Sequence, residues 1–300
     1  MPDLTTHYLF AKQTLSLLEP GLQAALREHF GVFAFGAQGP DFFFFHQGGK
    51  GPLTEYGDLL HHDKLQEVFL YMAATLPLKK GFEQEILSAY CMGYVCHYLL
   101  DRSIHPFVYA EEERLRQSGG PHAGDHLHAK IEAQIDAALY PHFEGKSVTT
   151  FQISREMPLA ASERWIIATF FSGLVKAIWS RTLPPLEIDR AIRGMFRFSP
   201  LFYDPTGLLY HTASAAAALI RPLRGGVGHM KPRHARGDAL NRQHRAWKNP
   251  FPPGQRSELS VIDLFEQAKQ EACPILERIS QTGLFDFDTT LDFNGCLIRA

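Results

Sequence analysis

The sequence predicts an all-α protein, a fold class indicated by three observations. Apolar residues recur at helical spacing along most of the 300-residue chain, whereas the alternating, β-branched stretches typical of strands are almost absent. Gly and Pro separate the helical stretches from one another. Hydrophobic residues make up 45% of the chain, which is enough for a sizeable core. We therefore expect a multi-helix bundle that forms a single domain over residues 1–300, with helices packed on helices.

The first part of the chain predicts three helices and one irregular segment. Residues 4–28 keep an apolar period of about 3.6 and predict a first helix. Residues 31–52, GVFAFGAQGPDFFFFHQGGKGP, predict a partly buried irregular loop, because their glycines and clustered phenylalanines fit neither a long helix nor a hairpin. Helical periodicity resumes over residues 56–76, and residues 83–110 predict a long, largely apolar helix.

The remaining chain continues the same pattern after a break at SGGPHAG, residues 118–124. Periodic apolar residues between Pro and Gly signals predict further helices. The expected helices cover residues 125–140, 158–180, 186–196, 206–222 and 258–280.

Residues 221–249 form a basic segment that differs from the rest of the chain. It carries eight Lys or Arg residues against the single acid Asp238, and it has almost no large apolar residues. This composition favours a mobile, solvated surface loop over a patch that binds anions.

Charge and the chain ends restrict the function classes. With 30 basic and 32 acidic residues the formal charge is −2, so we expect no stable complex with nucleic acid. The sequence shows no signal-peptide pattern and no apolar stretch near the roughly 18 residues of a membrane span. We therefore expect no transmembrane segment and a cytoplasmic location; the oligomeric state is left open.

His97, Asp101 and His105 form a ladder on one face of the long apolar helix. Four residues of helix rise about 6 Å, so the ladder is about 12 Å long. Zinc bonds measure about 2.0 to 2.2 Å, which places the two end histidines poorly for a single ion, whereas the central carboxylate has two oxygens and can serve neighbouring ions. The spacing therefore indicates a metal cluster.

Each ladder residue taken singly also fits a structural role, as a satisfied core histidine or as an aspartate paired with Arg102 or with a lysine. The triple favours metal binding, because an unpaired buried carboxylate costs several kcal/mol and coordination cancels its charge.

Further candidate ligands occur in the neighbouring segments. His128 and Glu132 stand four residues apart on the following helix, with His126 and Asp136 as alternative or supporting groups. Adjacent histidines cannot both face inward on a helix, and of His61 and His62 we favour His61. The other candidates are His7 at the start of the first helix and Asp41 between Gly-Pro and a run of phenylalanines.

These motifs occur in an order that resembles the zinc-dependent phospholipase C family, whose distant relatives include fungal single-strand nucleases. The motifs are TH at 6–7, GAQGPD at 36–41, HH at 61–62, HYLLDRSIHP at 97–106 and HAKIE at 128–132. The resemblance implies an all-α fold that holds two or three Zn²⁺ ions. In that arrangement the ligands are His61, His97 and Asp101 for one ion, with Asp41 beside it, His105, His128 and Glu132 for another, and His7 with a bridging Asp101 for a third.

One feature departs from the pattern of the family. Secreted members also hold the third zinc through the amino group and carbonyl of an N-terminal tryptophan, whereas this sequence begins MPDLTTH. Asp3, the terminus of the chain or solvent would have to complete that site.

The resemblance implies a metal-dependent phosphoric ester hydrolase, specifically a phospholipase C-like phosphodiesterase. Its substrate would be a phospholipid or another small phosphoester, and Asp41 would be a ligand or would position or deprotonate the attacking water. Phe42 to Phe45 could line an apolar entrance, although core packing is favoured. Two alternatives stay open: an HD-type metal phosphohydrolase that uses His62 and Asp63, and a non-catalytic protein that is stabilised by zinc or binds lipid.

Overall fold

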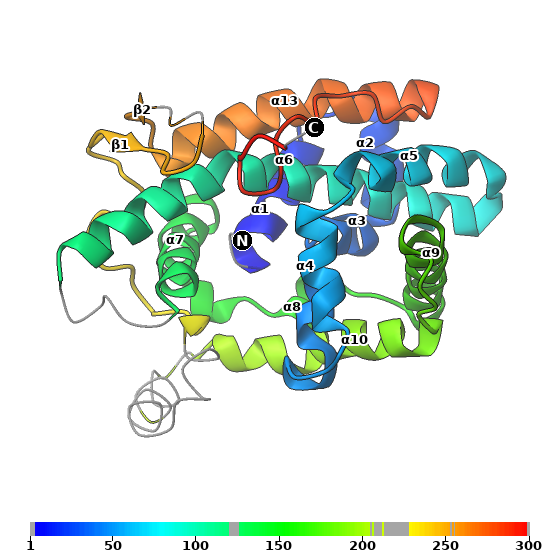
Figure 1. Ribbon diagram of the computed structural model, residues 1–300, viewed down its shortest axis with the longest axis horizontal. Helices are drawn as coiled ribbons and strands as arrows, with labels where there is room; N and C mark the ends of the chain where they lie inside the picture. The colour runs from blue at the N-terminus through cyan, green and yellow to red at the C-terminus, as the bar shows by residue number, and fades with distance from the viewer. Residues whose placement is uncertain are drawn as a thin grey trace.

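The computed structural model describes residues 4–119, 126–204, 206, 212, 228–252, 254 and 256–298, and within these ranges the protein is predominantly helical (Figure 1). The predicted all-α class is thus confirmed. The only named strands in the described ranges are β1 (Trp247–Lys248) and β2 (Arg256–Ser257), which pair antiparallel. The helices are α1 (Leu4–Leu15), α2 (Pro20–Glu28), α3 (Phe30–Gly36), η1 (Asp41–Gly48), α4 (Thr54–His62), α5 (Leu65–Thr75), η2 (Leu76–Leu78), α6 (Gly81–Gln117), α7 (Leu127–Glu144), η3 (Val148–Thr150), α8 (Ile153–Glu156), α9 (Ala161–Trp179), α10 (Pro185–Phe198), η4 (Ser199–Phe202) and α13 (Val261–Thr282).

Helix α6 is the central element of the fold. It runs across the molecule beside α13 (Figure 1) and also packs on α1, α3, α7 and α9. Its middle turns are buried on every side, as expected for a helix enclosed by other helices. Tyr90, Tyr94 and Tyr98 are among its fully buried side chains. Because other helices enclose α6, the side chains on its buried turns are held in fixed positions.

The closest packing around α6 occurs at Gly93, where α3 crosses it. A Cβ atom at this position would fall against the carbonyl oxygen of Phe33 and only 2.7 Å from the Cα of Gly36. Both contacts are with backbone, which cannot turn aside as a flexible side chain can. Glycine is therefore required here so that the two helices can approach each other.

We expect Gly93→Ala to lower the free energy of unfolding by about 2 to 3 kcal/mol, because the added methyl group overpacks the contact between α3 and α6. Urea unfolding of the purified variant measures the effect. Gly21→Ala is the matched control: Gly21 lies in α2 with nothing within 4 Å of an added Cβ, so this change should be neutral or slightly stabilising. Equal stability of the two variants would contradict the close-packing argument.

Two predicted helices are each divided in the structure, and the expected irregular loop contains helices. The helix predicted over 4–28 is wrong as a single element, because α1 ends at Leu15 and α2 starts with Pro20 as its first residue. The helix predicted over 56–76 breaks after α4, where Lys64 takes a positive φ of 52°. Residues 31–52 contain α3 and the 3-10 helix η1 rather than irregular chain alone.

The predicted helices over 158–180, 186–196 and 258–280 correspond to α9, α10 and α13. The one predicted over 206–222 lies outside the described residues except at positions 206 and 212. None of the described helices has the length and apolar character that crossing a membrane requires.

The basic segment 221–249 is described from residue 228 onward. Several of its side chains are enclosed there: Lys231 and Leu240 are each 1% exposed, and Asn241 is fully buried. Arg245 forms an ion pair with Glu111 of α6. These positions are packed against the helices and differ from the solvated surface loop that composition suggests.

Candidate metal centre

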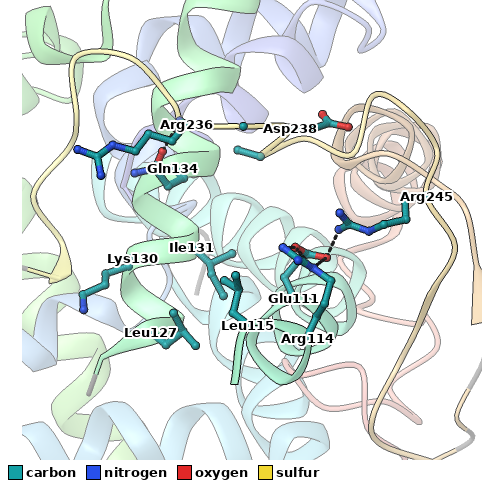
Figure 2. A pocket seen from close by; sticks show the side chains of 12 residues that line it. Glu111, Arg114, Leu115, Leu127, Lys130, Ile131, Gln134, Arg236, Asp238 and Arg245 are labelled. Carbon is teal, nitrogen blue, oxygen red and sulfur yellow. Dashed lines mark hydrogen bonds and ion pairs between the residues drawn. The ribbon is translucent and has the colours of Figure 1, made fainter. Parts of the chain in front are cut away.

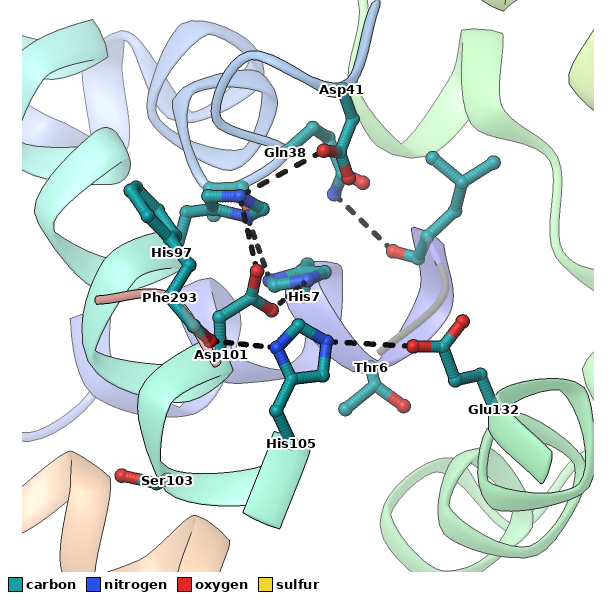
Figure 3. A network of polar contacts seen from close by, with 12 residues as sticks. Thr6, His7, Gln38, Asp41, His97, Asp101, Ser103, His105, Glu132 and Phe293 are labelled. Carbon is teal, nitrogen blue, oxygen red and sulfur yellow. Dashed lines mark hydrogen bonds and ion pairs between the residues drawn. The ribbon is translucent and has the colours of Figure 1, made fainter. Parts of the chain in front are cut away.

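The residues of the predicted ladder lie buried in the middle of α6. His97 and Asp101 are fully buried and His105 is 2% exposed (Figure 3). Four other elements bring ligand-type side chains to them. The structure gathers all eight predicted residues in three groups whose ligand atoms lie within 4.8 Å of one another: His7, His97 and Asp101; Asp41, His61 and His97; His105, His128 and Glu132.

Asp101 lies between two imidazole groups. Its Oδ1 is 3.1 Å from Nε2 of His7, and its Oδ2 is 3.5 Å from Nε2 of His97. Burial by itself raises the pKa of Asp101, but the surrounding histidine rings hold that pKa below its usual range. The side chain is therefore a carboxylate, and its two oxygens face two different histidines.

The second group joins η1, α4 and α6. The Nε2 atoms of His61 and His97 are 3.3 Å apart. Oδ1 of Asp41 lies 3.3 Å from the first of these nitrogens and 3.8 Å from the second. One oxygen and two nitrogens thus converge on one point, as they do in a zinc site with mixed nitrogen and oxygen ligands.

The third group lies between the C-terminal half of α6 and the start of α7. Oε1 of Glu132 is 3.0 Å from Nε2 of His128 and 3.6 Å from Nε2 of His105. His128 and Glu132 are one helical turn apart on α7, so both project toward α6.

Four of the histidines are oriented through Nδ1. Each Nδ1 contacts an oxygen that can only accept a hydrogen bond, so Nδ1 carries the proton and, in the neutral ring, Nε2 keeps its lone pair for a metal ion. The acceptors are the carbonyls of Gly57 for His61 (2.7 Å), Ala37 for His97 (3.2 Å) and Phe293 for His105 (2.7 Å), and Oε2 of Glu112 for His128 (3.3 Å).

The electrostatics of the centre match a cation site. Burial lowers the pKa of His61 to about 4 and that of His97 well below its usual value, so these rings are neutral and ready to coordinate. Burial and the nearby Asp101 raise the pKa of Asp41. Among the described residues, Oδ1 of Asp41 and Oδ2 of Asp101 are buried without a hydrogen-bond donor. Because buried carboxylate oxygens require a partner, these residues fit a bound metal ion.

Asp136, which the sequence suggested as a supporting metal ligand, instead holds the start of α1. It is fully buried and accepts hydrogen bonds from the backbone N–H groups of Thr5 (3.2 Å) and Thr6 (3.0 Å). Lys231, from the basic segment, lies 3.1 Å away from the same carboxylate. This network fixes the helical turn that carries His7. Sequence reasoning missed it because α1, α7 and residue 231 meet only in three dimensions.

The adjacent His62 and Asp63 point away from the metal centre. The side chain of His62 is 51% exposed, and its nearest carboxylate is Asp292 at 3.9 Å. Asp63 accepts a hydrogen bond from the indole of Trp179 at 2.8 Å. The HD-type alternative requires His62 and Asp63 to act together as a pair. In the structure each of these side chains contacts a different partner instead.

The four consecutive phenylalanines divide between two environments. Phe42 and Phe43 are fully buried in the core. Phe44 is half-buried, and its ring stacks on His61 with a centroid distance of 5.9 Å. Core packing therefore accounts for the first two, whereas Phe44 lies beside His61, one of the candidate metal ligands.

A cavity of about 340 Å³ lies between α6, α7 and residues 236–245 (Figure 2). Apolar residues such as Leu127 and Ile131 line it, together with the Glu111–Arg245 ion pair. None of the eight ligand residues lines this cavity. It is separate from the metal centre.

Comparison with known families agrees with this geometry. Residues 6–180 match the family model described as zinc dependent phospholipase C. The match covers more than half of the chain and includes all eight ligand-type residues. Neither a curated protein nor a solved structure matches the chain.

Proposed function

The chain belongs to the zinc-dependent phospholipase C family, and from this premise we propose that it is a zinc-dependent phosphoester hydrolase acting on phosphodiesters, with phospholipids as the leading substrate class. The observation that carries the proposal is the gathering of the eight ligand-type residues into three largely buried groups, two of which share His97. We propose two or three Zn²⁺ ions, held by the eight ligand residues.

Each group has a defined role in this proposal. Bound zinc supplies Lewis acidity, which polarises a phosphoryl oxygen and lowers the pKa of a water molecule toward about 7. Asp41 lies at the edge of the group formed with His61 and His97, where its carboxylate can accept a proton from the attacking water. Asp101 keeps its negative charge and compensates the positive charge on both sides of it.

A lipid substrate is supported by the aromatic side chains next to the ligands. Phe44 stacks on His61. At the opposite group, the ring of Tyr109 lies 4.8 Å from both His128 and Phe251. All three aromatic side chains are only partly buried. Apolar rings near the reacting group suit a substrate that has an apolar part attached to its phosphate.

Removal and return of zinc tests the proposal. We expect the purified protein to contain at least two zinc ions per chain by mass spectrometry and to hydrolyse phosphatidylcholine in mixed micelles. Dialysis against a chelator should reduce hydrolysis by more than 100-fold, and added Zn²⁺ should restore it, because the reaction depends on the ions.

Two parallel measurements sharpen this test. A soluble phosphodiester, a phosphomonoester and a single-stranded oligonucleotide are assayed beside the lipid, and preference for the lipid supports the proposed substrate class. Stoichiometric zinc without turnover of any of the four compounds would contradict the proposed function and favour a non-catalytic zinc protein.

A further inference from the structure

The segment 288–298 near the C-terminus contacts the metal centre from outside the region that matches the family model. We call it the C-terminal clasp. It is a compact turn: Leu291 and Leu297 form an isolated β-bridge, and Oδ1 of Asp292 accepts hydrogen bonds from the backbone N–H groups of Asn294 (2.8 Å) and Cys296 (2.9 Å). These hydrogen bonds are made within the segment and hold the turn in one shape. The segment can therefore present a fixed surface to α6.

The clasp binds one face of α6 over three turns of that helix. Tyr98 donates to the carbonyl of Leu291 at 2.8 Å, Arg102 donates to the carbonyl of Asp288 at 2.7 Å, and Tyr109 donates to Oδ1 of Asn294 at 3.0 Å. A Cβ atom at Gly295 would lie 2.7 Å from Cγ of Pro106 and 2.8 Å from the carbonyl oxygen of Arg102. The turn therefore lies directly against the helix that carries the ladder.

Phe293 is the part of the clasp that reaches the metal ligands, as Figure 3 shows. Its carbonyl accepts the Nδ1 proton of His105 at 2.7 Å. Its ring is fully buried and packs against His61 and His97, with centroid distances of 4.8 Å and 5.4 Å. One residue thus contacts histidines from all three ligand groups, because His97 belongs to two of them.

From these contacts we infer that the C-terminal clasp completes the metal centre and that Phe293 is a positioning residue for His61, His97 and His105. The inference rests on the proposed function, because it assigns these histidines to zinc. Outer contacts fix the ring orientation and the proton position of zinc-binding histidines, and their loss typically weakens metal binding by about 10- to 100-fold.

The test is zinc affinity of the full chain, measured by competition with a chelator, together with the visible absorption spectrum of the cobalt-loaded protein. Phe293→Ala should weaken the affinity of at least one ion by about 10- to 100-fold and shift the cobalt bands, which report ligand geometry. Phe293→Leu fills most of the apolar space and should restore affinity to within about threefold of the unaltered chain.

Phe287→Ala is the matched control. The ring of Phe287 packs on Phe69 (4.8 Å) and Tyr98 (6.0 Å), and none of its ring contacts among the described residues is with a metal ligand. This variant should lose thermal stability but keep zinc affinity and the cobalt spectrum. If Phe293→Ala behaved in the same way, Phe293 would be a packing residue and the inference would be overturned.

Gly295→Ala provides a second test of the inference if Phe293→Ala does not fold. It keeps the phenylalanine side chain but forces the turn away from α6, at a backbone φ of +69° that disfavours alanine. Weakened zinc binding supports the inference, and unaltered zinc affinity with an unaltered cobalt spectrum overturns it. Neither readout needs turnover, so a chain that binds zinc without hydrolysing phosphoesters would refute the proposed function while these variants still decide the role of the clasp.

Discussion

Asp101→Asn is expected to reduce phosphodiester hydrolysis by roughly 10³-fold and to lower the zinc content, while the ion at His105, His128 and Glu132 is retained. The carboxylate is fully buried, and its two oxygens face His7 and His97, the second of which belongs to two of the ligand groups. An amide of the same size has no charge and only one acceptor oxygen. A buried charge left without its partner costs about 4 kcal/mol, and a loss of that size in the zinc-bound transition state corresponds to roughly 10³ in rate.

Zinc content by mass spectrometry and the rate of hydrolysis measured on the same sample test this prediction. Asp63→Asn is the matched control, because Asp63 is a nearby aspartate whose side chain accepts from Trp179 and takes no part in the ligand groups. It should keep full zinc and full activity. An Asp101→Asn protein with unaltered zinc content and turnover would contradict the role of Asp101 as a metal ligand.

The ladder on α6 could be predicted because it is local. Spacing along one helix fixes which side chains share a face, and the structure places His97, Asp101 and His105 among the buried residues of α6. The long helix itself was expected over 83–110 and extends over Gly81–Gln117. The helix breaks were harder to predict, although Pro20 at the start of α2 was a signal in the sequence that indicated one of them.

The hydrogen-bond acceptors of His97 and His105 could not be predicted, because they are backbone atoms from distant segments. The carbonyl that accepts from His105 belongs to Phe293, which is 188 residues away in the sequence. The carbonyl that accepts from His97 belongs to Ala37. Every residue has a carbonyl, so no pattern of residue types marks these two. The contacts depend on how the end of α3, α6 and the C-terminal clasp pack together.

The sequence pattern and the tertiary packing inform on different chemical properties of the metal centre. Residue types and spacing indicate which atoms can bind zinc, whereas tertiary packing decides which nitrogen of each histidine is available. Since the Nδ1 atoms of His61, His97, His105 and His128 all face acceptor oxygens, the packed fold selects Nε2 at each of these positions before any ion is bound. This preorganisation is what a site needs to hold several ions close together.

Asp41→Asn is expected to lower kcat by about 10² to 10⁴-fold, the usual range for loss of a general base. Asp41 is 4% exposed, and its Oδ1 lies 3.3 Å from Nε2 of His61. The amide keeps the shape of the side chain but cannot take a proton from water. Zinc content should fall by no more than one ion, because His61 and His97 remain in place.

The pH dependence separates proton transfer from metal binding at Asp41. A base acts only in its deprotonated form, so the activity of the unaltered chain should decline as the pH falls through the pKa of the base. If Asp41 is that base, the residual activity of Asp41→Asn should lack this decline. Asp58→Asn, an exposed substitution in α4, is the control and should retain the full profile. A variant that keeps the acidic limb but loses zinc would show instead that Asp41 acts as a metal ligand, since its carboxylate would then be required for coordination rather than for proton transfer.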